Sequence, residues 1–71
     1  MPAIGWSDSD EIGFQLYEKF PEVDPLTVRF TDLRRWVTEL DEFQDDTAAS
    51  SEGALEAIQT AWLEYYREEE D

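Results

Sequence analysis

The sequence predicts a small, mainly α-helical domain, and three observations lead to this prediction. The chain has 71 residues, which is enough for one domain with one core. Three stretches carry apolar residues at the three- and four-residue spacing of a helix face. Residues that stop or cap helices stand between those stretches. Because 41% of the residues are apolar and 14% are aromatic, we expect a folded domain of modest stability rather than acidic disorder.

The first helix is expected to begin after Ser7 or Asp8 and to stop before Pro21. Both starting residues are good N-caps, and Asp8 with Glu11 has the spacing of a capping box. Its apolar stripe recurs at every fourth residue and consists of Ile12, Leu16 and Phe20, with Tyr17 beside them.

Short connecting elements follow this helix. Asp24 before Pro25 predicts the cap of a single helical turn. Val28-Arg29-Phe30 is a candidate for a short extended segment, and Thr31 is the expected N-cap of the second helix.

The second helix has the full i, i+3, i+4, i+7 apolar signature, carried by Leu33, Trp36, Val37 and Leu40. Residues 41–47 have neither helical nor strand periodicity and are predicted to form a loop. Phe43 is expected to attach this loop to the core.

Ser50 or Ser51 is expected to start the third helix, which gives the strongest helix prediction in the chain. One face of it stays apolar for three turns and holds Ala54, Leu55, Ile58, Ala61, Trp62 and Tyr65. Residues 68–71 are all acidic and lie at the negative end of a helix dipole, so this tail is expected to fray. The whole chain, 1–71, is read as a single three-helix domain of helix-turn-helix or winged-helix type with minimal extended segments.

The charge of the chain excludes several functions. Nineteen acidic residues against five basic ones give a net charge of −14, which disfavours nucleic acids and anionic membranes as partners. Residues 39–71 alone hold twelve acids and one base, for a net charge of −11. Without Cys or His there is no disulfide, no thiolate or imidazole metal site, and no nucleophile–histidine pair. Because the chain lacks a nucleophile–histidine pair, we expect that it is not an enzyme. Its N-terminus has no basic region followed by an apolar run, and no apolar segment approaches the length of about 18 residues that crosses a membrane, so we expect a cytoplasmic protein.

The acidic loop is the one candidate for metal chemistry. Carboxylate oxygens suit hard divalent ions such as Ca²⁺, Mg²⁺ and Mn²⁺ and, more weakly, Fe²⁺. Residues 41–46 lack the acid spacing and the glycine of an EF-hand loop, so any site there should be weak and unselective. A solvated acidic surface that keeps the protein soluble is the competing interpretation.

The block Val28-Arg29-Phe30-Thr31-Asp32-Leu33 with Trp36 resembles the IscX family, small acidic accessory proteins of bacterial iron–sulfur cluster assembly. The resemblance covers almost the whole chain. It continues through Trp6-Ser7-Asp8, Ile12-Gly13, Leu16, Pro21, Asp24-Pro25, Leu40, Phe43, Asp45-Asp46, Ser50, Glu52, Leu55-Glu56-Ala57-Ile58 and Trp62-Leu63. The chain departs from the family pattern at Thr47, at Ser51 and in its extended acidic end, which affects a loop, a cap and a tail.

The resemblance implies a modified winged-helix fold that binds no DNA. It also implies a partner, the cysteine desulfurase IscS, for whose basic surface the protein would compete with bacterial frataxin. Weak Fe²⁺ binding through acidic side chains, without a bound iron–sulfur cluster, is a further implication, and a monomer is expected.

The site residues are predicted from charge density and from the family pattern. The densest acidic run outside the tail is predicted to bind the metal: Glu39, Asp41, Glu42, Asp45 and Asp46. Residues predicted to bind the partner combine this run with matches to the family: Asp8, Glu11, Arg29, Asp32, Asp41, Glu42, Asp45 and Asp46. For Asp8, Glu11 and Asp32, helix capping is an equally good explanation, and Arg29 could instead pair with Asp32.

Two other functions stay open at this point. The chain could be an acidic mimic of DNA, or another protein-binding module without a metal role, since regularly spaced carboxylates can imitate phosphates. A direct DNA-binding protein would need a basic recognition helix, for which Arg34 and Arg35 are all that this chain offers.

Overall fold

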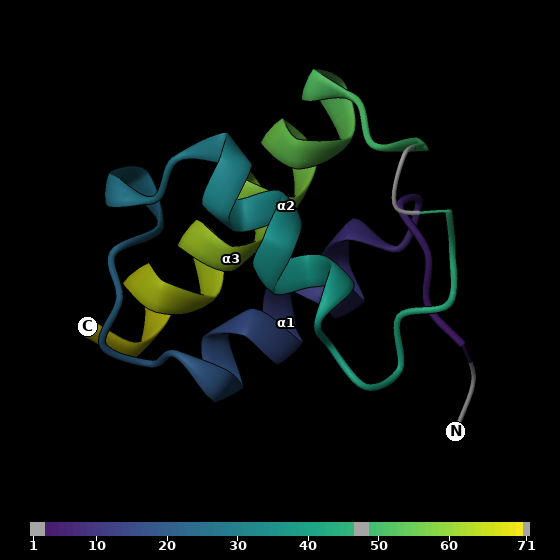
Figure 1. Cartoon of the computed structure of the whole chain (residues 1–71). Coiled ribbons are helices and arrows are strands. Elements are labelled where there is room, and N and C mark those ends of the chain that lie inside the picture. The colour runs from purple at the N-terminus through teal and green to yellow at the C-terminus, as the bar shows by residue number, and fades with distance from the viewer. Residues whose placement is uncertain (1–2, 47–48, 71) are drawn as a thin grey trace.

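The computed structural model describes residues 3–46 and 49–70, with only the backbone of residues 69 and 70. The described elements are α1 (Ser9–Lys19), the 3₁₀ turn η1 (Pro25–Thr27), α2 (Phe30–Thr38) and α3 (Glu52–Glu70). In Figure 1, α2 lies in front of α3, and α1 runs below both. The three predicted helices are thereby confirmed.

The described residues form no strand. The β-type pairing among them is an isolated parallel bridge between Ile4 and Phe43. Winged-helix proteins carry a strand hairpin as the wing. The structure therefore confirms the three helices of the fold prediction and does not confirm the winged-helix type.

Helix α1 begins and ends close to where the sequence predicts. Asp8 is the N-cap, but its carboxylate accepts a hydrogen bond from the backbone N–H of Gly5 (2.9 Å) and caps no amide of the helix. The predicted capping box with Glu11 is therefore absent, because the Asp8 carboxylate accepts from the Gly5 amide instead. The chain leaves the helix at Phe20, directly before Pro21.

The turn η1 forms as expected, and α2 starts earlier than expected. The Asp24 carboxylate accepts from the backbone N–H of Leu26 (3.0 Å) and caps η1. Arg29, rather than Thr31, is the N-cap of α2, since its carbonyl accepts the first helical bond, from Leu33 N–H (2.8 Å). Val28 and Arg29 are extended, but Phe30 is already helical, where its side chain packs against the core.

Helix α3 begins where a serine cap predicts it. The Ser51 hydroxyl accepts from the Ala54 backbone N–H (3.1 Å), which fixes the first turn. The backbone stays helical to Glu70, and Asp71 lies outside the described residues. Helical geometry does not measure how often an end opens, so fraying of residues 68–71 stays a prediction.

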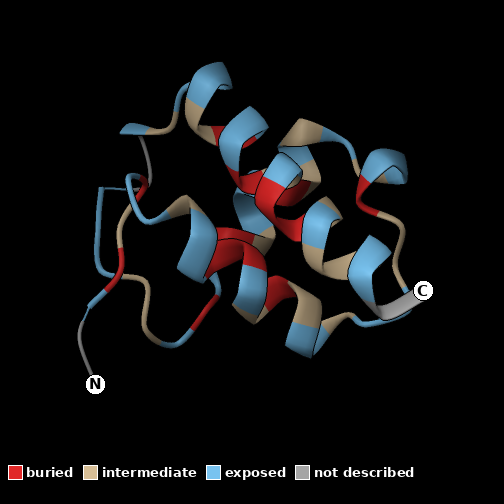
Figure 2. Ribbon diagram, turned by 180° about the vertical axis from the view of Figure 1, so that it is seen from behind, coloured by how far each residue is buried: buried red, intermediate tan, exposed pale blue. Residues whose placement is uncertain are grey.

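The core lies where the three helices meet, as the red segments in Figure 2 show. α1 packs mainly on α3. Trp62 of α3 is fully buried in this core. The Trp62 indole N–H has no hydrogen-bond acceptor among the described residues; Trp36 stands edge-on to its ring, with centroids 6.3 Å apart. Trp62 thus lies in the core and Trp36 packs against it, as their places on the apolar stripes predict, and Trp6 is buried in the same core.

None of the helices in the described ranges combines the length and the apolar character that crossing a membrane requires.

Candidate functional site

An open groove lies between α1 and the segment that follows α2. Its volume is about 790 Å³. Residues from three parts of the chain line it: Ile4, Glu11, Phe14, Gln15, Glu18, Lys19, Leu40, Asp41 and Glu42. We call it the α1 groove.

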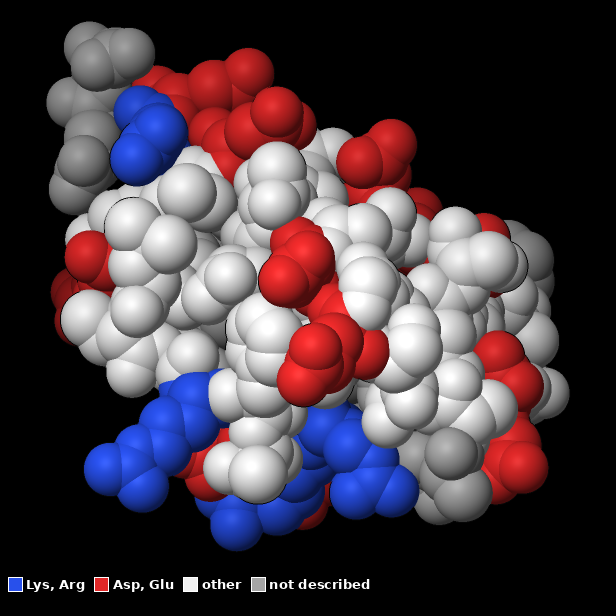
Figure 3. Space-filling view, turned by 90° about the horizontal axis from the view of Figure 1, so that it is seen from above, with Lys and Arg blue, Asp and Glu red and all other residues white. Residues whose placement is uncertain are grey.

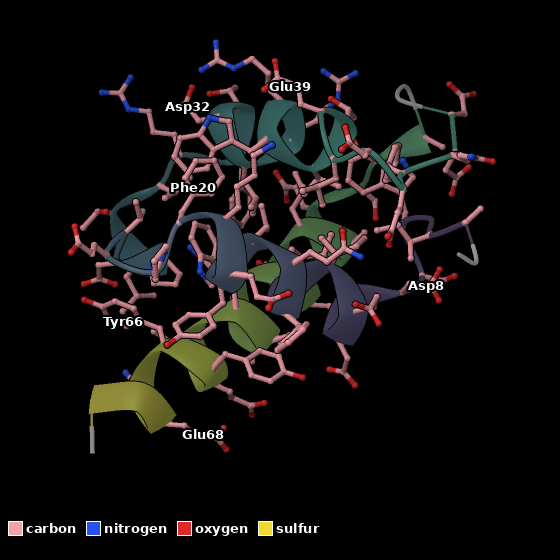
Figure 4. The ribbon with its side chains drawn as sticks, turned by 90° about the horizontal axis from the view of Figure 1, so that it is seen from below. Asp8, Phe20, Asp32, Glu39, Tyr66 and Glu68 are labelled. Carbon is pink, nitrogen blue, oxygen red and sulfur yellow. The ribbon has the colours of Figure 1, made fainter. Side chains whose placement is uncertain are left out.

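The helical wall of the groove comes from the outward face of α1. Glu11, Phe14, Gln15 and Glu18 follow one another at i, i+3, i+4 and i+7, which places them on one face of the helix. Ile12, Gly13 and Leu16 are buried on the other side, against α3. Burial of this inner stripe therefore fixes the direction of the outer stripe. Figure 4 looks onto this side of α1.

The second wall is held by the N-terminal segment. The backbone N–H of Ile4 donates to the carbonyl of Glu42 (3.0 Å), and the N–H of Gln44 donates back to the carbonyl of Ile4 (2.9 Å). Leu40 is buried below the loop, and the Phe43 ring packs edge-on against Trp6, with centroids 4.9 Å apart. These contacts confirm that Phe43 attaches the loop to the core and hold Asp41 and Glu42 opposite α1.

Gln15 links the two walls. Its amide nitrogen donates to Glu42 Oε2 at 2.7 Å and, at 3.4 Å, to Glu11 Oε2 in the preceding turn. An amide donor between two carboxylates reduces their repulsion and still leaves acceptor capacity on both. The groove thus presents fixed carboxylates to solvent.

The charge of the α1 groove is strongly negative. Four carboxylates line it, from Glu11, Glu18, Asp41 and Glu42, and the one cationic lining residue is Lys19. The arginines lie elsewhere: Arg29, Arg34 and Arg35 are exposed at or near α2, and Arg67 is exposed in the last turn of α3. Figure 3 shows Lys and Arg side chains gathered mainly at one edge of the face seen from above. The charges are therefore segregated, which leaves the groove suited to a cationic ligand.

The structure brings together three of the predicted partner-binding residues, Glu11, Asp41 and Glu42, in the groove. The remaining ones do not line it: Asp8, Arg29, Asp32, Asp45 and Asp46. Figure 4 shows Asp32 on α2 and Asp8 at the beginning of α1, well apart. Asp32 lies 3.7 Å from the guanidinium of Arg35, so its ion pair is with Arg35 and not with Arg29.

Asp45 and Asp46 have structural hydrogen bonds. Asp45 Oδ2 accepts from the backbone N–H of Trp6 (3.1 Å), and its Oδ1 accepts from Asp46 N–H (2.7 Å). The Asp46 carbonyl accepts from the Trp6 indole N–H (2.8 Å). Both residues therefore hold the loop on Trp6.

The predicted metal ligands do not form a ready-made site. In residues 3–46 and 49–70, no group of three or more Asp, Glu, His or Cys residues is placed to hold a metal ion. Glu39 is the C-cap of α2, and the Asp45 carboxylate is engaged by backbone amides. The acidic run is dense in sequence, but the loop separates its side chains in space. These residues, as they stand, do not fit a preformed iron centre.

The groove residues that sequence reasoning missed include three on the outward face of α1: Phe14, Gln15 and Glu18. A signal for them existed in the i, i+3, i+4, i+7 spacing with Glu11, opposite the apolar stripe of the same helix. That pattern predicts a shared outward face, but not the loop that faces it.

Comparison with known proteins shows a family and a relative to which the chain is similar. Residues 4–67 match the family model described as iron–sulphur cluster assembly. The chain is also similar to a Pseudomonas aeruginosa protein described as uncharacterized protein PA3808. The two are 58% identical over 62 residues, which covers 87% of this chain and 94% of the relative.

Proposed function

The chain belongs to the iron–sulphur cluster assembly family, which is the IscX family that its sequence resembles, and we propose that it serves iron–sulphur cluster assembly as an acidic accessory protein. In this proposal the protein docks through its α1 groove on a basic surface of the cysteine desulfurase IscS and modulates that enzyme. It is not itself an enzyme, and it acts in the cytoplasm as a monomer that competes with bacterial frataxin.

The observation that supports the proposal most strongly is the meeting of carboxylates from two separate segments around one groove. Hydrogen bonds fix both walls, so a cationic partner would find the acidic side chains already positioned. Mutual repulsion within the groove is relieved when opposite charge arrives, which favours binding and speeds encounter.

The choice of IscS and the modified winged-helix topology come from the family resemblance. The charge of the chain narrows the class of partner independently, because a protein of net charge −14 is repelled by nucleic acids and by anionic lipid surfaces. A basic protein surface is the partner that remains.

Weak Fe²⁺ binding is also part of the proposal, because the family resemblance implies it. Carboxylate oxygens alone give weak and unselective binding of divalent ions. Because the described residues hold no preformed ligand group, we expect a Kd of about micromolar or weaker, with Ca²⁺ and Mn²⁺ competing. Anaerobic calorimetry with each ion measures this, and Fe²⁺ binding that excludes Ca²⁺ and Mn²⁺ would contradict it. No step of the proposed docking passes through iron.

The docking proposal is tested by neutralising the groove. The variant Glu11→Gln, Glu18→Gln, Asp41→Asn removes three exposed charges and spares the Gln15–Glu42 hydrogen bond. We expect its affinity for the desulfurase to fall about tenfold or more, mainly through slower association, as measured by biolayer interferometry at physiological salt.

The matched control carries Glu22→Gln, Glu52→Gln and Glu56→Gln. It changes the net charge by the same amount at exposed positions that do not line the groove. We expect a loss of about threefold or less, because only long-range steering is affected. Equal losses in the two triple variants would show that net charge alone drives binding. No binding of the wild type would refute the choice of partner.

A further inference from the structure

Phe14 is an exposed aromatic residue within the acidic face of α1. Phe14 is 39% exposed, and Leu26 is the other large apolar residue of the described chain that is exposed rather than buried or half-buried. It stands on the outward stripe between Glu11 and Glu18, away from the buried stripe of the helix.

Phe14 lines two adjacent hollows. One is the α1 groove, and the other, of about 420 Å³, is lined by Asp10, Glu11, Phe14 and Tyr65. Glu11 and Phe14 belong to both. The ring therefore stands on the ridge between two acidic depressions.

Other aromatic rings fix the position of this ring. Phe14 meets Tyr65 edge to face, with centroids 5.3 Å apart and an interplanar angle of 63°. Tyr65 is in turn stacked on Tyr17, at 6.4 Å and 22°. Contacts across the two helices hold an aromatic surface in place before any ligand arrives. We call Phe14 and Tyr65 the aromatic platform.

We propose that the aromatic platform receives an arginine side chain of the protein partner, with the carboxylates of Asp10 and Glu11 beside it to accept from the guanidinium. This inference rests on the proposed function, since it names the side chain that the acidic surface takes. A guanidinium is planar and weakly hydrated, so it stacks on an aromatic face while it donates to carboxylates at its edge. The compact ammonium of lysine is more strongly hydrated, so it is less suited to contact the aromatic face and the carboxylates at the same time.

Charge complementarity decides the kind of occupant. A second copy of the chain would bring another net charge of −14 against the same acidic rim. Nucleic acid and anionic lipid are also negative, and a neutral apolar peptide would leave the rim carboxylates without a cation. A basic segment of a protein satisfies both the ring and the carboxylates.

The test compares Phe14→Ala with Leu26→Ala in binding to the desulfurase. Leu26 is the matched control because it is apolar and more exposed (59%), but it belongs to η1 and lines neither hollow. We expect Phe14→Ala to weaken binding about five- to thirtyfold and Leu26→Ala to change it less than about twofold. Equal effects of the two substitutions would overturn the proposal.

A second variant separates an aromatic role from a simple apolar one. Phe14→Leu keeps apolar area at the position and loses the ring face, so we expect it to recover less than half of the lost affinity. Full recovery would show that a guanidinium does not stack there. Far-ultraviolet circular dichroism and the urea midpoint check folding, and if Phe14→Ala unfolds, Phe14→Leu carries the comparison alone.

A peptide experiment distinguishes failure of the platform from failure of the proposed function. Blocked tetra-arginine and tetra-lysine peptides are added at equal ionic strength while the ring signals of Phe14 and Tyr65 are followed by NMR. We expect larger shifts with tetra-arginine, reduced at Tyr65 in the Phe14→Ala variant. This result without desulfurase binding would refute the proposed partner and support the platform. Equal shifts with both peptides would overturn the platform even where the desulfurase binds.

Discussion

At the scale of single residues, Gly13 shows how closely α1 and α3 approach each other. A Cβ atom at this position would lie 2.7 Å from the backbone nitrogen of Trp62 and 2.8 Å from the Cβ of Ala61. Both neighbours belong to the buried face of α3, so neither yields easily. The absence of a side chain at Gly13 is therefore what sets the distance between the two helices.

Replacing Gly13 with alanine is expected to destabilise the protein. Overpacking costs about 1–3 kcal/mol, which exceeds the gain of about 1 kcal/mol in helix propensity. The matched control is Gly53→Ala in the first turn of α3, where the nearest atom to a new Cβ is 4.0 Å away, and there we expect a small gain. The measurement is the urea unfolding midpoint; a Gly13→Ala protein as stable as Gly53→Ala would contradict the close approach.

Asp45 shows that an acidic residue on the surface of this chain can stabilise it. Its carboxylate accepts from the backbone amides of Trp6 and Asp46 and joins the loop to the N-terminal segment. A Cβ added to Gly5 would lie 2.6 Å from Asp45 Oδ2, so the two segments also fit closely.

Asp45→Ala is expected to lower the free energy of unfolding by about 1–2 kcal/mol, because two backbone donors lose their acceptor. Asp41→Ala in the same loop removes an equal charge from an exposed groove residue, and we expect it to be neutral or slightly stabilising. Thermal unfolding of both variants at physiological salt measures the difference. If Asp45→Ala were the more stable of the two, repulsion would outweigh these hydrogen bonds.

At the scale of the elements, the helix termini are stabilised unequally. α3 starts on a serine cap, whereas α2 starts on Arg29, which supplies no side-chain acceptor. α3 is 19 residues long and ends in acidic residues, with Arg67 as the one base in its last turn. Negative charge at the negative end of a helix dipole is unfavourable by about 0.3–1 kcal/mol per residue.

We therefore expect backbone amides of residues 68–71 to exchange with solvent deuterium far faster than those of Ile58 to Trp62, which lie in the core. Glu68→Lys should slow exchange in the last turn, since a cation suits that end, and Glu52→Lys in the first turn of α3 should speed exchange there. Equal protection along the whole of α3 would show that the tail is held by contacts that the charges do not predict.

At the scale of the whole molecule, repulsion between acidic side chains is the dominant electrostatic effect on stability. The five basic residues cannot balance nineteen acidic ones, and the ion pair between Arg35 and Asp32 is largely exposed. Such exposed pairs contribute little to stability. The acidic surface thus lowers the stability of the free protein, and the proposed basic partner would relieve this repulsion.

The thermal midpoint is expected to rise with salt. Between 10 mM and 150 mM NaCl the Debye length falls from about 30 Å to about 8 Å, which screens repulsion between exposed carboxylates. For a domain of this size, each kcal/mol of relief shifts the midpoint by about 4–8 °C. Calorimetric scans at both salt concentrations measure the shift. The triple groove variant should show a smaller rise, and a midpoint independent of salt would mean that the surface charges repel one another less than their number predicts.

The sequence by itself determined the helices, their approximate ends, the core tryptophans and the excess of acid. These features follow from local spacing and from composition, which are properties of the chain before it folds. It also carried the family resemblance, because residue types in order are what a family shares. The start of α2 is an exception to this agreement between sequence and structure. The helix begins at Phe30 rather than after Thr31, because packing of Phe30 against the core overrode the local preference for a threonine cap.

Only the tertiary structure decided which acidic residues act together. Glu11 and Glu42 are far apart in sequence, yet both contact the amide of Gln15. Asp45 and Asp46 stand beside Asp41 and Glu42 in sequence, yet they bind the N-terminal segment instead of lining the groove. The physical reason is that charge density along a chain does not fix side-chain direction. That direction is set by the bridge between Ile4 and Phe43 and by the burial of Leu40, which are long-range contacts without a local signature.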